Sequence, residues 1–108
     1  DAVYIYTETF PKEELYGLTN QIRKSVVSVP SNIAEGQAQI TTKGFIHHLG
    51  IAYGSLCELE TQTFIAYRRH YLSRPRLEEL IGKASEVGRL INGLLRSLRQ
   101  KSSLATDH

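Results

Sequence analysis

The sequence has a single cysteine, and its apolar residues never form a long uninterrupted run. Cys57 has no second thiol to pair with among the 108 residues, so an internal disulfide is excluded. One cysteine fits a reducing compartment, and we expect a cytoplasmic protein. No apolar run approaches the ~18 residues of a membrane span, and the start shows no signal-peptide pattern. Length and composition predict one globular domain over residues 1–108.

The chain also lacks the motifs that carry metal, phosphate or nucleophilic chemistry. It has no His-Glu-x-x-His or Glu-x-x-His motif, and His47 and His48, as neighbours, diverge by about 100° on a helix. Ser55 and His48 are separated by about 10 Å along a helix, too far for a nucleophile and its base. We therefore expect no enzyme: no catalytic residue, no metal and no cofactor.

Apolar residues recur in steps of three and four after Phe10, which predicts helices over residues 18–35, 42–69 and 74–100. The stripe of the second of these helices consists of Phe45, Leu49, Ala52, Leu56, Leu59, Thr63 and Ala66. The stripe of the third consists of Leu77, Leu80, Ala84, Val87, Ile91, Leu94 and Leu98. Residues 1–9 fit either the end of a helix or a strand, and residues 101–108 are expected to fray. Long helices with short connections predict an all-α, up-and-down four-helix bundle with a short first helix.

Two polar groupings have a structural and a functional interpretation. Pro30 lies inside a predicted helix, and Asn32 and Glu35 are candidates to bond the backbone groups that it frees. Gly36 then fits a left-handed helix stop. Arg23 is expected to pair with Glu58 or Glu60 on the facing helix, where the pair would fix the helix register. The alternative is a polar ligand site between helices, or an RNA surface at Asn32 and Glu35.

Basic residues are concentrated in the second half of the chain. Arg68, Arg69, Arg74 and Arg76 surround one connection, and Arg96 and Arg99 continue along the last helix. Arginines attract phosphate by releasing counterions, and the interleaved Tyr67 and Tyr71 could stack on unpaired bases. These six arginines are the candidate nucleic-acid contacts; the alternative is a solvated helix end. A second apolar edge of the 42–69 helix, formed by Ile46, Tyr53, Phe64 and Tyr67, could instead bind a protein partner.

Two motifs resemble a known family. They are Ser28-Val29-Pro30-Ser31-Asn32-Ile33-Ala34-Glu35-Gly36 and Gly54-Ser55-Leu56-Cys57-Glu58-Leu59-Glu60-Thr61. Together with Phe10-Pro11-Lys12-Glu13-Glu14, Tyr16-Gly17-Leu18 and Gln21-Ile22-Arg23, they resemble the bacterial four-helix bundle proteins encoded in intervening sequences of 23S ribosomal RNA genes, over about residues 10–98.

The resemblance implies a left-handed four-helix bundle that assembles into a homopentamer. It also implies similarity to the accessory protein of diversity-generating retroelements, whose basic surface engages nucleic acid. The family's usual first helix is missing here or reduced to residues 1–9. The resemblance therefore favours a non-enzymatic oligomer that binds RNA or DNA, with the protein-interaction scaffold as the alternative.

Overall fold

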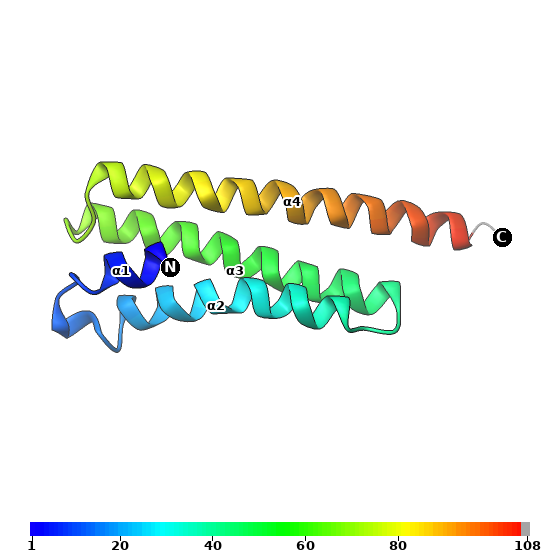
Figure 1. The fold of residues 1–108 in the computed structure, drawn as a ribbon, viewed down its shortest axis with the longest axis horizontal. Helices are drawn as coiled ribbons and strands as arrows, with labels where there is room; N and C mark the ends of the chain where they lie inside the picture. The colour runs from blue at the N-terminus through cyan, green and yellow to red at the C-terminus, as the bar shows by residue number, and fades with distance from the viewer. Residues whose placement is uncertain (107–108) are drawn as a thin grey trace.

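The computed structural model describes residues 1–106, and for residues 102–106 it describes the helical backbone alone. Within them the chain is all-helical: α1 (Ala2–Thr7), the 3-10 turn η1 (Lys12–Glu14), α2 (Leu18–Gln37), α3 (Thr42–Arg68) and α4 (Arg74–Thr106). Figure 1 shows α2, α3 and α4 side by side, each reversing the direction of the last, while the short α1 lies against α2 and α4. The predicted bundle with a truncated first helix is confirmed.

The predicted apolar stripes form the core. In α3, the six stripe residues that follow Phe45 are buried, and Phe45 is half-buried. In α4, the residues that bury most of their surface are Leu77, Ala84, Ile91 and Leu95. Repeats of three and four place one side chain per turn on the same face of a helix, and burial of that face stabilises the packed helices.

The short α1 leaves part of the bundle uncovered. Beyond Asp1 an apolar groove of about 770 Å³ continues between α2 and α4, with Val29 and Ile33 on one wall and Val87 and Leu94 on the other. Leu90, at its margin, is 69% exposed. Leu94 belongs to the predicted core stripe but remains exposed, because α1 does not extend far enough to cover it.

The prediction of a left-handed stop at Gly36 was wrong. No glycine among the described residues has a positive φ, and α2 runs through Gly36 to Gln37. A Cβ at Gly36 would lie 2.9 Å from Cδ1 of Phe45 and 3.2 Å from Cβ of His48. The residue lacks a side chain because α3 approaches α2 closely there, not because the backbone turns.

Hydroxyl side chains cap the starts of α3 and α4. Thr41 accepts the Gly44 amide at 3.0 Å, and Ser73 accepts the Arg76 amide at 3.4 Å. α4 does not fade after Gln100 but continues to Thr106, so the predicted frayed tail was wrong over residues 101–106; residues 107–108 lie outside the described part.

Candidate nucleic-acid interface

Four of the predicted contact arginines form a loop-end cluster, defined as Arg68, Arg69, Arg74 and Arg76. The chain reverses here because His70 takes a left-handed conformation, with φ at 65°. Its amide donates to the Tyr67 carbonyl at 3.0 Å, and the Tyr71 amide donates to the Ala66 carbonyl at 2.9 Å. This turn brings the end of α3 and the start of α4 together, as the sequence predicted.

Most of the loop-end cluster is already engaged within the molecule. Arg69 lies 3.7 Å from a carboxylate oxygen of Glu14, and Arg74 lies 3.2 Å from one of Glu78. The Arg76 guanidinium lies 4.5 Å from the centre of the Tyr6 ring. In the described chain, Arg68 is the member without such a contact. Neighbouring carboxylates lower the attraction of this cluster for phosphate.

The predicted stacking aromatics at this end are largely covered. Tyr71 packs on Phe10 with ring centres 5.6 Å apart, and Tyr67 is half-buried against the core. Phe10 is buried, and its contact with Tyr71 holds the segment between α1 and η1 against the α3–α4 connection. Tyr71 therefore contributes to packing, which leaves less of its ring free for the predicted stacking on bases.

The two other predicted arginines belong to a second group. This distal cluster, defined as Arg89, Arg96, Arg99 and Lys101, is exposed on the second half of α4. Arg96 lies twenty residues beyond Arg76, about 30 Å along the helix axis. Arg96 and Arg99 line a hollow of about 480 Å³ with Asn92 and Gln100. All four lining side chains are hydrogen-bond donors, so the hollow suits an anion.

Within the described chain no ion pair involves the distal cluster, although Glu86 precedes Arg89 by one helical turn and Glu35 lies near the end of α2. α3 begins toward the same end of the bundle (Figure 1), and Lys43 is its second residue. The sequence has no Asp or Glu between residues 36 and 57 or between residues 87 and 106. The loop end, by contrast, carries Glu14, Glu78 and Glu79 beside its arginines. The positive potential is therefore least compensated at the distal end.

Arg23 does not pair with Glu58 or Glu60, so that prediction was wrong. Its Nε donates to Oγ1 of Thr7 at 3.0 Å, and its guanidinium lies 5.1 Å from the centre of the Tyr4 ring. Both partners belong to α1, which lies on the flank of α2 from which Arg23 projects. Glu58 is exposed and Glu60 half-buried, on different sides of α3.

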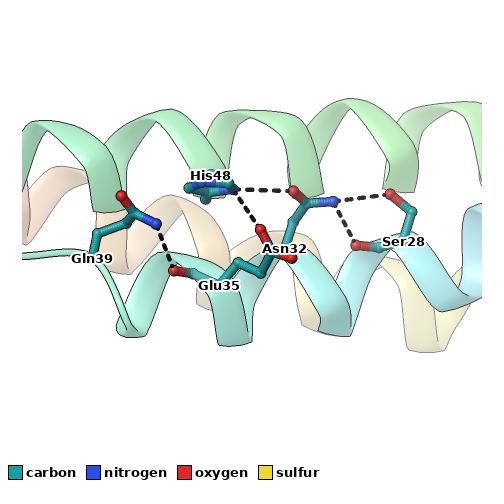
Figure 2. Close-up of polar contacts among 5 residues, drawn as sticks. All are labelled: Ser28, Asn32, Glu35, Gln39 and His48. Atoms are coloured by element: carbon teal, nitrogen blue, oxygen red, sulfur yellow. Dashed lines mark hydrogen bonds and ion pairs between the residues drawn. The ribbon is translucent and has the colours of Figure 1, made fainter.

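Asn32 joins α2 to α3 (Figure 2). Its Nδ2 donates to the Ser28 carbonyl at 2.9 Å and to Ser28 Oγ at 3.1 Å, while its Oδ1 lies 3.3 Å from Nδ1 of His48. The Glu35 carboxylate lies 4.0 Å from the same His48 nitrogen. Gln39 donates to the Glu35 carbonyl at 3.2 Å. These contacts connect two helices and favour the structural interpretation of Asn32 and Glu35.

The prediction that Asn32 bonds a backbone group freed by Pro30 was wrong. The carbonyl that loses its donor is that of Val26, four residues before Pro30. Asn32 instead bonds the carbonyl of Ser28, which lies one turn before Asn32 itself. The facing residue His48 draws the amide toward α3, and no feature of the local sequence indicates that choice.

Further polar contacts continue along the α2–α3 seam. Ser28 and Ser55 have hydroxyls 2.8 Å apart, and Ser25 donates to Oε1 of Gln62 at 3.1 Å. The seam opens into a polar groove of about 510 Å³ that also exposes Lys24 and Glu58. The serines and Gln62 satisfy one another's hydrogen bonds, so these side chains serve to pack α2 against α3.

Tyr6 and Glu79 tie α1 to α4. The Tyr6 hydroxyl donates to the Glu79 carboxylate, and Lys83 lies 3.3 Å from that carboxylate. The hydrogen bond to Glu79 raises the pKa of Tyr6, and the hydrogen bonds from Tyr6 and then Lys83 lower the pKa of Glu79. Both shifts favour the state in which the phenol is protonated and the carboxylate is ionised.

We expect Tyr6→Phe to flatten the dependence of stability on pH at both extremes. A lowered Glu79 pKa stabilises the fold above the ordinary value of 4.5 and loses that effect as the pH falls through the lowered pKa. A raised Tyr6 pKa stabilises the fold below 10.0 and loses that effect as the pH rises through the raised pKa. Urea midpoints of both proteins across this range measure the difference; identical pH curves would contradict the link.

Two absences hold for the residues that the structure describes. No helix among them is both long and apolar enough to cross a membrane. No three His, Cys, Asp or Glu side chains among them gather where they could hold a metal ion. Cys57 is exposed on α3.

The molecule is thus a four-helix bundle with a truncated first helix and a group of basic side chains along the second half of α4. The chain belongs to the 23S rRNA-intervening sequence protein family, whose model matches residues 1–93. The match includes both motifs that carried the resemblance. No match is found among curated proteins.

A solved structure supports the fold. It is the crystal structure of a protein of unknown function from the S23 ribosomal protein family of Bacteroides thetaiotaomicron. The two superpose with a TM-score of 0.79 at 23% identity, over 87% of this chain and 87% of that chain. At this identity the likeness concerns the fold alone.

Proposed function

We propose that the protein is a non-enzymatic nucleic-acid-binding module whose main contact surface is the distal cluster. The observation that carries the proposal is the pairing of exposed Arg89, Arg96, Arg99 and Lys101 with stretches that contain no acidic residue. Guanidinium groups bind phosphate oxygens in a forked geometry, and a polyanion gains affinity by releasing counterions. The loop-end cluster is a secondary contact, weakened by Glu14 and Glu78.

The family description supports RNA as the first ligand to test, because it names a ribosomal RNA intervening sequence. The proposal includes no catalytic residue and no cofactor. We also propose a cytoplasmic location, since a chain with one cysteine does not depend on an oxidising compartment.

The salt dependence of binding tests the proposal. Four phosphate contacts predict that the affinity falls about 50- to 150-fold between about 50 and 200 mM salt. Fluorescence anisotropy with labelled RNA and DNA at both salt concentrations measures it. Binding that does not change with salt, or no binding at the lower concentration, would contradict the proposal.

We propose in addition that the protein works as a homo-oligomer, with a pentamer as the expected form. Exposed apolar side chains on α3, among them Ile51 and Ile65, support self-association. A ring would repeat the distal cluster and raise avidity for a long polyanion. Light scattering gives the mass; a monomer at micromolar concentration would contradict this part alone.

A protein-interaction scaffold is the second candidate function. Its support is the α3 edge, where Tyr53 is 38% exposed and Phe64 is 47% exposed, with Ile46 and Tyr67 half-buried beside them. Partner capture that survives nuclease and high salt, and is lost in Phe64→Ser, distinguishes this function from nucleic-acid binding.

A further inference from the structure

An exposed aromatic side chain lies at one end of the distal cluster. A Cβ at Gly88 of α4 would lie 3.9 Å from Cε2 of Tyr53 and 3.4 Å from Cδ2 of Leu56, so α3 packs directly on the α4 backbone there. Leu56 is buried, but Tyr53 is 38% exposed. The absence of a side chain at Gly88 leaves the Tyr53 ring open beside the flank of α4.

The arginines lie on that same flank. Successive helical residues rotate by about 100°, so Gly88, Asn92, Arg96 and Arg99 fall in one row along α4. Arg96 is eight residues from Gly88, about 12 Å along the axis. The row therefore leads from the Tyr53 ring to the hollow formed by Asn92, Arg96, Arg99 and Gln100.

This row combines the groups that an unpaired nucleotide chain requires. The guanidiniums of Arg96 and Arg99 supply phosphate contacts, and the carboxamides of Asn92 and Gln100 can bond base edges. The Tyr53 ring supplies a face on which a base can stack. Stacking needs a base that has left its duplex, whereas phosphate contacts alone do not.

The packing of α4 argues against insertion into a duplex. The major groove of B-form DNA admits a single helix. α4 packs on α3 at Gly88, so the flank is a wall formed by two helices. Such a wall can follow a flexible strand but does not enter the groove.

We infer that this surface binds single-stranded nucleic acid, with a base stacked on Tyr53 and the neighbouring phosphates held by Arg96 and Arg99. The inference rests on the proposed function and adds to it the form of the ligand. RNA and DNA strands share this chemistry and are separate arms of the test.

The test compares variants at Tyr53 by fluorescence anisotropy. The probes are labelled single strands of about 16 uridines or thymidines, together with a duplex of equal length. Wild-type protein is expected to bind the single strands more tightly than the duplex. Tyr53→Leu is expected to weaken single-strand binding about tenfold or more. Tyr53→Phe keeps the ring and is expected to bind like wild type, because stacking does not need the hydroxyl.

Tyr16 provides the matched control, because it is 90% exposed and precedes α2 at the opposite end of the bundle. Tyr16→Leu is expected to leave binding unchanged, and thermal unfolding checks that each variant folds. If Tyr53→Leu binds single strands like wild type, or if the duplex binds more tightly, while Arg96→Gln with Arg99→Gln still loses binding, the inference fails and the proposed function stands. If wild-type protein binds no probe, both fail.

Discussion

Replacing Arg89, Arg96, Arg99 and Lys101 together by glutamine is expected to weaken nucleic-acid binding about 100- to 1,000-fold near 0.1 M salt. Each lost phosphate contact removes the release of about one counterion, and four are lost together. Glutamine keeps a similar side-chain length and helix propensity, so α4 is expected to remain intact. The slope of affinity against salt should decrease in the same variant, and anisotropy titrations measure both quantities.

The loop-end cluster supplies a control with the same change of charge. Replacing Arg68, Arg69, Arg74 and Arg76 by glutamine removes four positive charges at the other end of the bundle. Because Arg69, Arg74 and Arg76 already contact Glu14, Glu78 and the Tyr6 ring, a loss of less than about tenfold is expected. Equal losses in the two variants would show that net charge alone sets the affinity. The reverse order would place the site at the loop end.

Replacing Leu49 by alanine is expected to lower the free energy of unfolding by about 2–5 kcal/mol. Leu49 is 0% exposed and lies in the stripe by which α3 packs on its neighbours. The variant loses the transfer free energy of the removed methyl groups and leaves a cavity that packed helices close only in part. Urea denaturation followed by circular dichroism measures the change.

Leu90 is the matched control for that substitution. It is 69% exposed on α4, so Leu90→Ala is expected to change the free energy of unfolding of the monomer by about 0.5 kcal/mol or less. The comparison isolates burial, because the chemical change is identical. A cost below about 1 kcal/mol at Leu49 would contradict the close-packed core described above.

The helices were predictable because burial repeats along the sequence. Leu49, Ala52 and Leu56 recur in steps of three and four, and the same rule identified Leu77, Ala84 and Ile91 in α4. The caps at Thr41 and Ser73 are likewise local, since each hydroxyl accepts an amide three residues ahead. Such signals involve neighbours in the sequence and need no knowledge of the fold.

The errors concern residues whose role depends on another helix. A glycine such as Gly36 is typical of a helix end, but here a side chain is excluded because the Phe45 ring of α3 lies too close. Arg23 had plausible partners in Glu58 and Glu60, yet it bonds Thr7 of α1. A single sequence lists possible partners without the distances that select among them.

The candidate site was predictable only in part for the same reason. The list of arginines came from composition, but the ranking of Arg96 and Arg99 above the loop-end cluster came from the carboxylates that the fold places near each group. Tyr53 was assigned to an apolar edge, and only its contact with Gly88 places it beside the arginines.

The sequence by itself determined the helices, the faces that they bury and the family, because these depend on spacing along one chain. The tertiary structure alone decided which charges are neutralised and which aromatic rings remain open. Those properties arise from pairs of residues far apart in sequence, such as Arg69 with Glu14 and Tyr53 with Gly88, whose separation is set when the helices pack.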